Sequence, residues 1–467
     1  MKLFNFQTKG ITTAAIILGA ASIVSAFLGI FRDRLLAGKF GAGDELDVYY
    51  AAFRIPDFVS MVLIMGSISA ALIPIFSEYI TRNNKEAWKF LSNLFNVVIV
   101  VLIFVCLLSV IFAPQLINII TPGFSEDKKE LVVMLTRIMF LSPIILGTSN
   151  IISSVLQVFR RFLITSLSPI MYNLGIIIGI VLFVPRLGIS GLAWGVVLGA
   201  VLHLLIQISV LLKVGFRYYN IFDISDPGLR RMIKLTIPRS IGLAAGQINF
   251  FVVTAIASTL TSGGLAVFSL SESLSRPFII LTGIAFSTAA FPHLTLSLSK
   301  EKKERFLEIF SKTFNKILIL IVPLSILLFI FREELVSFVF QVGRFGLLES
   351  RLTAACLAMF CFGLFAKALN LFIVRSFYAL QDTRIPAGVS VISMFLNLFL
   401  CIIFVWLLSF PNLFQNFWIN FLSLENLNGI EIVGLPLALS VSAIFQYIVL
   451  KLIFRTKLKR LKENGEY

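Results

Sequence analysis

The sequence predicts an all-α polytopic membrane protein, with about twelve transmembrane helices in two six-helix lobes that are related by a parallel pseudo-two-fold repeat. Three observations support this fold class. The composition is 58% hydrophobic and only 14% charged, which is typical of membrane proteins. The apolar residues are gathered into runs that approach the roughly 20 residues needed to cross the hydrocarbon core. The two halves of the sequence also resemble each other.

The first half contains six apolar segments. The first of them follows Lys2 and Lys9 and ends near small residues, as a secretory signal does. Its apolar part is long, however, and the repeat requires it, so we interpret it as a span. The second is long, and we expect it to break near Pro56 and Pro74, because proline removes a helical hydrogen bond. The predicted spans are residues 11–31, 48–80, 91–113, 131–157, 163–184 and 188–212.

The second half contains six further segments, of which the second is again long and contains two prolines. We expect breaks near Pro277 and Pro292, as in the first half. The predicted spans are residues 232–260, 264–298, 313–331, 353–379, 386–409 and 432–454. The corresponding lobes are an N-lobe of residues 1–223, with spans 1 to 6, and a C-lobe of residues 224–467, with spans 7 to 12.

The repeat is visible when the halves are aligned. ISAALIPIFSEYITRNNKEAWKFLSNLFN, which ends at Asn96, parallels FSTAAFPHLTLSLSKEKKERFLEIFSKTFN, which ends at Asn315. The prolines of the two segments are 218 residues apart and the asparagines 219. Six spans per half is an even number, so both halves enter the membrane from the same side. Parallel repeats of this kind are a transporter architecture, with the binding site between the halves.

The distribution of lysine and arginine among the connections predicts the orientation. Of the 40 basic residues, 26 fall on the side that holds the N-terminus and alternate loops, and 9 fall on the other side. Because cytoplasmic loops are enriched in positive charge, both termini are predicted to be cytoplasmic. The positive net charge therefore faces anionic lipid head groups, and no aromatic-interleaved basic patch indicates a nucleic-acid partner.

A few basic residues remain inside the spans, where a charge is costly and rare without a role. Arg54 lies two residues before Pro56, and Arg276 lies one residue before Pro277 at the corresponding place in the second half. A proline break leaves backbone groups free to line a polar cavity. Two arginines from the two lobes would suit a bidentate grip on phosphate or pyrophosphate. The complete set is Arg54, Arg137, Arg239, Arg276 and Lys367.

A structural interpretation of these arginines is also open. Each could lie near an interface and extend its guanidinium to water, or could pair with Asp47, Asp57 or Glu272 in a salt bridge. Arg137 and Arg239 lie nearer to span ends and fit this interpretation better. The paired positions of Arg54 and Arg276 favour a cavity.

Metal, cofactor and covalent chemistry have little support in the sequence. The four cysteines lie inside apolar runs, without the pairing or histidine neighbours of a metal or disulfide framework. The two histidines, His203 and His293, are far apart in sequence. No phosphate-binding loop or nucleophile motif is present. We therefore expect no cofactor and no metal site.

Six motifs, in their order along the chain, resemble the MurJ/MviN lipid II flippases, a family within the multidrug/oligosaccharidyl-lipid/polysaccharide exporter superfamily. The similarity runs from the first span to about residue 455. The motifs are FRD (Phe31–Asp33), FGAGDELDVYYAAFRIPDF (Phe40–Phe58), GSISAALIPIFSEY ending at Tyr79, TPGF (Thr121–Phe124), FQVGRF (Phe340–Phe345) and FYALQDTRIP (Phe377–Pro386).

The resemblance implies alternating access between two six-helix lobes in the bacterial cytoplasmic (inner) membrane. The lobes would move lipid II, the undecaprenyl-pyrophosphate-linked peptidoglycan precursor, from the inner to the outer leaflet through a cationic central cavity. One chain that holds both lobes needs no protein partner, so a functional monomer is expected.

The resemblance also implies which residues bind the substrate. Arg32 and Asp33 match an Arg-Asp pair that ends the first span, Asp47 matches an acidic residue that opens the second, and Arg54 matches a basic residue before its proline. Where members have an Asp-Arg pair in the eighth span, this chain has Ser271-Glu272, with Arg276 one helical turn further on. Ala26 and Met61 stand where many members have arginine. The candidate set is Arg32, Asp33, Asp47, Arg54, Glu272 and Arg276.

Two other functions remain as alternatives at this point. An exporter of the same superfamily could carry another polyprenyl-linked glycan or a small molecule. An integral-membrane glycosyl or phosphoglycosyl transferase would need clustered carboxylates for a metal, or a base beside a nucleophile. The acidic residues of this chain are scattered singly through loops, so we expect a transporter and not an enzyme.

Overall fold

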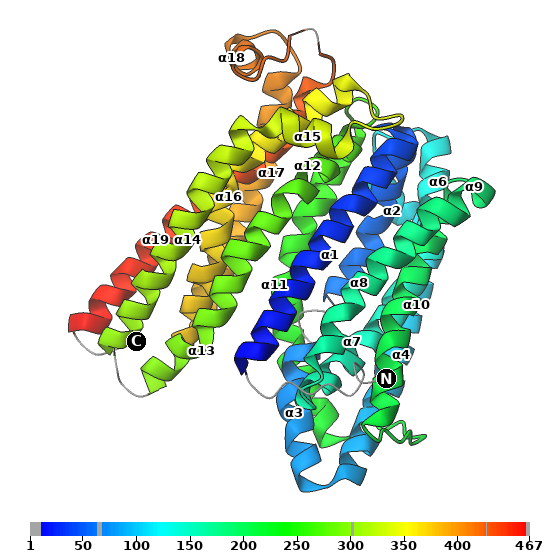
Figure 1. Cartoon of the computed structure of the whole chain (residues 1–467), viewed down its shortest axis with the longest axis vertical. Coiled ribbons are helices and arrows are strands. Elements are labelled where there is room, and N and C mark those ends of the chain that lie inside the picture. Colours follow the sequence, from blue (N-terminus) through cyan, green and yellow to red (C-terminus); the bar gives the residue numbers. More distant parts are fainter. Residues whose placement is uncertain (1–10, 63–67, 300–302, 426, 464–467) are drawn as a thin grey trace. The chain divides into compact units, whose positions relative to one another are not determined.

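The computed structural model of the protein describes residues 11–62, 68–299, 303–425 and 427–463, and these residues form helices and no β-strand (Figure 1). They divide into two compact units. Unit 1 comprises the described residues of Met1–Leu36 and Asp47–Phe251, and unit 2 those of Ala37–Leu46 and Val252–Tyr467. The division falls inside a helix, whereas the sequence repeat places the lobe boundary between residues 223 and 224. That boundary therefore stays a prediction.

Unit 1 contains the helices of the first half of the chain, and three of them, α1, α2 and α11, also have residues in unit 2. In chain order the elements are α1 (Ile11–Phe40), α2 (Asp44–Ser60), α3 (Ile68–Arg82), α4 (Asn84–Ile111), α5 (Ala113–Ile120), α6 (Glu126–Met139), α7 (Leu141–Val158), α8 (Phe162–Ile178), the π-helix η3 (Gly179–Phe183), α9 (Val184–Leu187), α10 (Ser190–Lys213) and α11 (Pro227–Ser258).

Unit 2 is organised around one long buried helix, α16, which packs against α12, α14 and α19. The elements are α12 (Gly264–Ile279), the π-helix η4 (Ile280–Ile284), α13 (Ala285–Ser299), α14 (Lys303–Ile330), α15 (Arg332–Phe340), α16 (Leu347–Ala379), α17 (Arg384–Leu408), α18 (Leu413–Leu422), the 3₁₀ turn η5 (Ile430–Val433) and α19 (Gly434–Glu463).

Each predicted span coincides with helical structure in the described residues, and nine helical stretches there are long and apolar enough to cross a membrane. The all-α polytopic fold is thus confirmed.

The helix breaks expected at the prolines are only partly found. The helix of Arg276 changes to π geometry three residues after Pro277, and α2 ends four residues after Pro56. Pro74 and Pro292 instead lie inside the unbroken helices α3 and α13, because proline has a helical φ and a span tolerates one missing bond.

The internal repeat appears in matching backbone junctions. Phe112 joins α4 to α5 with φ −86° and ψ 8°, and Phe331 joins α14 to α15 with φ −93° and ψ 22°. The turns before α8 and α17 also match, since Arg160 and Gln381 both have positive φ, at 57° and 58°. In each turn the amide after the left-handed residue donates a hydrogen bond to the carbonyl five residues earlier. Arg161 donates to Leu156, and Asp382 donates to Phe377. Both turns are therefore Schellman caps.

Glycines allow α8 and α10 to approach closely in unit 1, where the two helices lie side by side (Figure 1). A Cβ added at Gly175 would lie 2.2 Å from the Cα of Gly199, and one added at Gly179 would lie 2.4 Å from the Cα of Gly195. Small residues at such crossings let helices pack in lipid, where no hydrophobic force drives them together.

We expect Gly175→Ala to destabilise the protein, because its methyl group would overlap the backbone of α10. Overpacking of this kind costs about 1–3 kcal/mol. Gly246→Ala in α11 is the matched control, since an added Cβ there meets no described atom within 4 Å. Thermal unfolding in detergent can be followed through the four buried cysteine thiols, which become reactive when the fold opens. Equal melting temperatures for the two variants would contradict this packing role.

Candidate functional site

The connection between the first two helices of each half places an arginine at the same distance from a left-handed glycine. Gly41, with φ +68°, lies between α1 and α2, and Gly263, with φ +84°, lies between α11 and α12. Arg54 and Arg276 are each thirteen residues beyond their glycine. Only glycine adopts this backbone conformation easily. The two arginines therefore occupy equivalent places in the repeat when counted from a structural landmark.

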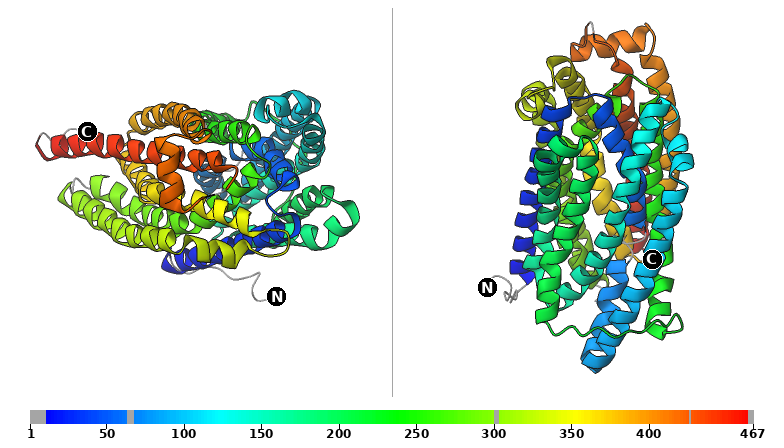
Figure 2. Two further views of the ribbon diagram at one scale, coloured as in Figure 1. Left: turned by 90° about the horizontal axis from the view of Figure 1, so that it is seen from above. Right: turned by 90° about the vertical axis from the view of Figure 1, so that its right-hand side faces the viewer.

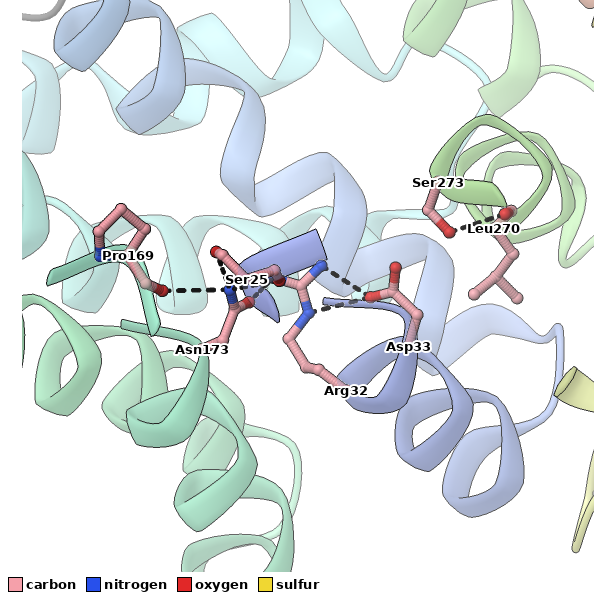
Figure 3. Close-up of polar contacts among 7 residues, drawn as sticks. All are labelled: Ser25, Arg32, Asp33, Pro169, Asn173, Leu270 and Ser273. Atoms are coloured by element: carbon pink, nitrogen blue, oxygen red, sulfur yellow. Dashed lines mark hydrogen bonds and ion pairs between the residues drawn. The ribbon is translucent and has the colours of Figure 1, made fainter. Parts of the chain in front are cut away.

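In unit 1, Arg32 connects α1 to α8 (Figure 3). Its Nε and Nη2 donate to the Asp33 carboxylate at 2.9 and 2.7 Å, and its Nη1 donates to the Oδ1 of Asn173 at 3.1 Å. The Nδ2 of Asn173 in turn donates to the hydroxyl and carbonyl oxygens of Ser25 and to the carbonyl of Pro169. Asp33 is buried. The Arg-Asp pair is thus a satisfied network that joins two spans.

Arg54 lies in the same unit, on α2. It is partly buried, and its guanidinium carbon lies 5.4 Å from the centre of the Phe250 ring of α11, a cation–π distance. Tyr50, one turn earlier, is within electrostatic range of Arg32, Asp33 and Arg54. The Tyr50 hydroxyl is buried and has no hydrogen-bond partner among the described residues. A polar group in this position is suited to meet a polar ligand or water.

Asp47 occupies the first turn of α2 and is buried in unit 1. This is where the sequence places it, at the opening of the second span. An acidic side chain near a helix N-terminus is favoured by the helix dipole. This placement explains the residue type without a ligand, so a substrate-binding role for Asp47 stays a prediction.

In unit 2, a second group of charges forms between α12 and α16. Arg276 donates to Glu272 at 3.2 Å, one helical turn away, and the arginine side chain remains 64% exposed. Lys367 of α16 is within electrostatic range of both residues, and its Nζ lies 4.5 Å from the centre of the Phe360 ring. A Cβ at Gly283 would lie 2.9 Å from the Cα of Ala368, so η4 approaches α16 beside Lys367. The group carries a net positive charge.

The structure therefore brings the candidate residues together in two sets. Arg32, Asp33 and Arg54 lie around Tyr50 in unit 1, and Glu272 and Arg276 lie with Lys367 in unit 2. The sequence did not indicate Tyr50 or Phe250 as neighbours of Arg54. Tyr50 belongs to an aromatic run that is typical of a buried helix face, and Phe250 comes from the distant helix α11. The side chain of Arg239 lies outside the described residues.

Metal-binding groups do not gather in the described part of the chain. No cluster of three or more His, Cys, Asp or Glu there could hold a metal ion. His203 is a buried member of a polar group in unit 1, where the Ser149 hydroxyl lies 2.7 Å from its Nδ1 and Gln207 lies one turn away. This histidine stabilises the packing of α7 against α10.

The motifs FGAGDELD and FQVGRF meet at one place in unit 2. The α1–α2 turn, residues 37–46, contacts the turns that precede α12 and α16. The Arg344 amide donates to the Gly38 carbonyl at 2.9 Å, and the Ser262 hydroxyl bonds to the Asp44 carboxylate. A Cβ at Gly263 would lie 1.9 Å from the Ala42 carbonyl oxygen. Gly343 of the FQVGRF motif is equally constrained, because a Cβ there would lie 2.2 Å from the Gly38 carbonyl oxygen. Both glycines are thus required for close contact between the turns.

The FYALQDTRIP motif has a structural role at the start of α17. One oxygen of Asp382 accepts from the amides of Arg384 and Ile385 at 3.1 and 3.2 Å, and the other accepts from Lys457 of α19. Burial by itself raises the pKa of Asp382, but the hydrogen bonds from Lys457, Ile385 and Arg384 outweigh it and hold the pKa below its usual value. The carboxylate therefore joins α16, α17 and α19 in its charged form.

Comparisons with known proteins point to one family. The profile of a family described as "Lipid II flippase MurJ" matches residues 36–465. A "Probable lipid II flippase MurJ" of Buchnera aphidicola subsp. Schizaphis graminum is 30% identical over 392 residues, which is 83% of this chain and 76% of the relative. The "Lipid II flippase MurJ" of Burkholderia cenocepacia is 25% identical over 387 residues, 81% of this chain and 75% of the relative.

Two solved structures share the fold. A structure described as "Lipid II flippase MurJ, inward closed conformation" has a TM-score of 0.78 at 24% identity, and the match covers 94% of this chain and 87% of that one. An inward-facing multidrug resistance MATE family transporter of the MOP superfamily has a TM-score of 0.74 at 14% identity, with coverage of 96% and 99%. At these identities the likeness concerns the two-lobe fold alone.

Asn173→Ala should destabilise the protein, because Arg32 loses an acceptor and Ser25 and Pro169 lose a donor. Bonds to a charged group contribute about 1.5–3 kcal/mol. Asn150→Ala in α7 is the control, since the Asn150 amide donates within its own helix, to the Leu146 carbonyl. The difference in melting temperature between the two variants measures the effect, and no difference would show that the α1–α8 link is dispensable.

Asp382→Asn should destabilise the protein by about 1 kcal/mol at neutral pH, because the amide cannot replace the charged contact with Lys457. The depressed pKa of Asp382 means that its stabilising effect is complete above the ordinary aspartate pKa of about 4 and disappears as the pH falls below it. The difference in melting temperature between wild type and variant should therefore shrink on acidification below about pH 4. A difference that stays constant with pH would argue against an ionic contribution.

Proposed function

The chain belongs to the lipid II flippase MurJ family, and we propose that it moves lipid II from the inner to the outer leaflet of the bacterial inner membrane by alternating access. It is a multi-pass membrane transporter and not an enzyme. The observation that carries the mechanism is the equivalent placement of Arg54 and Arg276. Each lies thirteen residues after a left-handed glycine.

The two charge groups suit the head group of such a substrate. Pyrophosphate is a dianion or stronger with several acceptor oxygens, and guanidinium groups bind phosphate through paired, charge-assisted hydrogen bonds. Arg276 is largely exposed and its hydrogen bond to Glu272 is 3.2 Å long, so a substrate anion can replace Glu272 as its acceptor. Lys367 adds a second positive charge to this group. We assign Arg54, Arg276 and Lys367 direct roles in anion binding.

Arg32 and Asp33 have a different proposed role. Their side chains bond to each other and to Asn173, so the pair positions α1 against α8 near Arg54. The substrate would meet this network at its exposed edge, through the partly exposed Arg32. Asp33 keeps Arg32 in place and limits the net charge of the region. Asp47 would act in the same way at the start of α2.

In the proposed orientation both termini are cytoplasmic, as the excess of basic residues on that side indicates. Cysteine in place of Glu86, in the first turn of α4, should then be protected from a membrane-impermeant thiol reagent in intact cells, whereas cysteine in place of Asp127, in the first turn of α6, should react. Both positions are exposed in the structure. The opposite pattern would invert the orientation.

Because one chain contains both halves of the repeat, we also propose a functional monomer, and a stable dimer in native mass measurements would contradict it.

Arg54→Ala and Arg276→Ala should each abolish complementation of cells depleted of their own lipid II flippase, with lipid II accumulating in the inner leaflet. The loss of one charge-assisted bond pair corresponds to roughly a 10- to 100-fold decrease in transport. The lysine variants should retain partial activity, because they keep the charge and lose the bidentate geometry.

Arg137→Ala is the matched control for the loss of an intramembrane arginine. The Arg137 guanidinium donates to the Val110 carbonyl at 3.3 Å, so its removal affects the packing of α6 against α4 and leaves the charge groups intact. Full complementation by Arg276→Ala, at wild-type protein level, would remove Arg276 from the site. An unchanged lipid II pool after depletion of the protein itself would overturn the proposed substrate.

A further inference from the structure

The short helix α18 has an exposed apolar edge that the transport function does not use. It contains 10 residues, LFQNFWINFL, without a charged side chain. In unit 2 it runs across the ends of α17 and α19 instead of continuing along them, at the end away from the last turns of α19 (Figures 1 and 2). The sequence predicts no span here, because the segment is too short to cross a bilayer.

Both ends of α18 are attached to the spans beneath it. Asn412 caps the helix by accepting from the Gln415 amide at 2.9 Å, and the Gln415 side chain donates to the Leu408 carbonyl at the end of α17 at 2.8 Å. At the other end Ser423 adopts a left-handed conformation, and its carbonyl accepts from Arg351 of α16. The orientation of the helix about its own axis is therefore determined by hydrogen bonds.

One face of α18 packs on aromatic side chains of the spans. The Phe414 ring stacks on Phe404 of α17 at 5.7 Å, and the Trp418 ring meets Phe362 of α16 at 6.1 Å. Residues 414 and 418 are one turn apart and lie on the same face of the helix. This packing leaves the opposite face exposed.

The exposed face has an apolar edge and a polar edge. Leu413 is 90% exposed and Phe417 57% exposed, and Phe421 follows them at the same four-residue interval. Phe421 is 47% exposed, and its ring also meets Phe329 of α14 at 5.9 Å. Asn416 and Asn420 lie along the other edge, and both are exposed. Such a division suits a helix that lies at the boundary between lipid and water.

The apolar edge continues a lipid-facing stripe of the preceding span. Phe395, Phe399, Ile402 and Trp406 are exposed along one face of α17, and α17 is a membrane-spanning helix by length and composition. The Trp406 ring contacts Phe410 at 5.0 Å, just before α18 begins. The exposed apolar surface thus extends from α17 through Phe410 to Leu413. Tryptophan at this position is typical of the interface between lipid and water.

We propose that α18 is an interfacial helix that inserts Leu413, Phe417 and Phe421 into the lipid of the leaflet at its end of unit 2, with Asn416 and Asn420 toward water. The occupant of the exposed edge is therefore the bilayer itself. Since α18 carries no charge, its insertion depends on apolar burial and not on anionic head groups. In the proposed orientation this leaflet is the outer one, but the inference does not depend on the transported substrate.

The experiment uses the full chain in nanodiscs, with a nitroxide label at Phe417→Cys and, as the matched control on the same exposed face, at Asn416→Cys. The four native cysteines are buried, and labelled wild-type protein gives the background. Label relaxation is measured with oxygen, which concentrates in lipid, and with a water-soluble nickel complex. We expect the ratio of oxygen to nickel accessibility to be several-fold higher at position 417 than at position 416, both in phosphatidylcholine and in phosphatidylglycerol.

Three outcomes would overturn the proposal. Equal, water-like accessibility at the two positions would place α18 in the aqueous phase. Protection of the Phe417→Cys label from both reagents would show that protein, such as a second copy of the chain, covers this edge. Insertion in phosphatidylglycerol alone would show that charge and not apolar burial controls the contact. If the Phe417→Cys variant melts below wild type, Leu413→Cys gives the same test at a position that makes fewer contacts.

Discussion

A charged group inside a membrane-spanning helix must find its hydrogen-bonding partners within the protein, and much of this structure depends on that constraint. Arg32 meets it through Asp33 and Asn173, which come from its own helix and from α8. Arg276 meets it through Glu272, one turn earlier on α12. The Arg32 network joins two spans, and the Arg276–Glu272 contact joins two turns of one helix. The more exposed pair is therefore the one whose partners can be exchanged for those of a substrate.

The same constraint applies to the backbone where a span bends. The junctions of the two halves are alike in detail, from the residues that join α4 to α5 and α14 to α15 to the Schellman caps that precede α8 and α17. Side chains have diverged far more than these junctions. A cap satisfies amides and carbonyls that the helix itself leaves unpaired, so a change there is costlier than a change of an apolar side chain facing lipid. Arg54 and Arg276 inherit their equivalent positions from this shared backbone.

Short helices were the main feature that the sequence did not reveal. The spans could be predicted because twenty apolar residues have few other uses. Helices α5, α15 and α18 have eight to ten residues each, which is too short for a hydropathy signal. For α18, the spans beside it supply hydrogen-bonding groups and aromatic surfaces. The breaks expected at Pro74 and Pro292 were wrong for a related reason. Whether a proline interrupts a span depends on the packing around it, and that cannot be read from the proline alone.

The sequence by itself determined the membrane fold, the repeat, and the rare charges inside the spans, because each is a property of composition or of order along the chain. The Arg32–Asp33 pair could also be predicted from the sequence, because the two residues are adjacent in it. Only the tertiary structure decided which groups surround them. Asn173 of α8 contacts Arg32, and Tyr50 of α2 and Phe250 of α11 lie near Arg54. Lys367 of α16 lies near Arg276, where Gly283 lets η4 approach α16. Such neighbours depend on how helix surfaces fit together, and sequence spacing carries no record of a contact between distant helices.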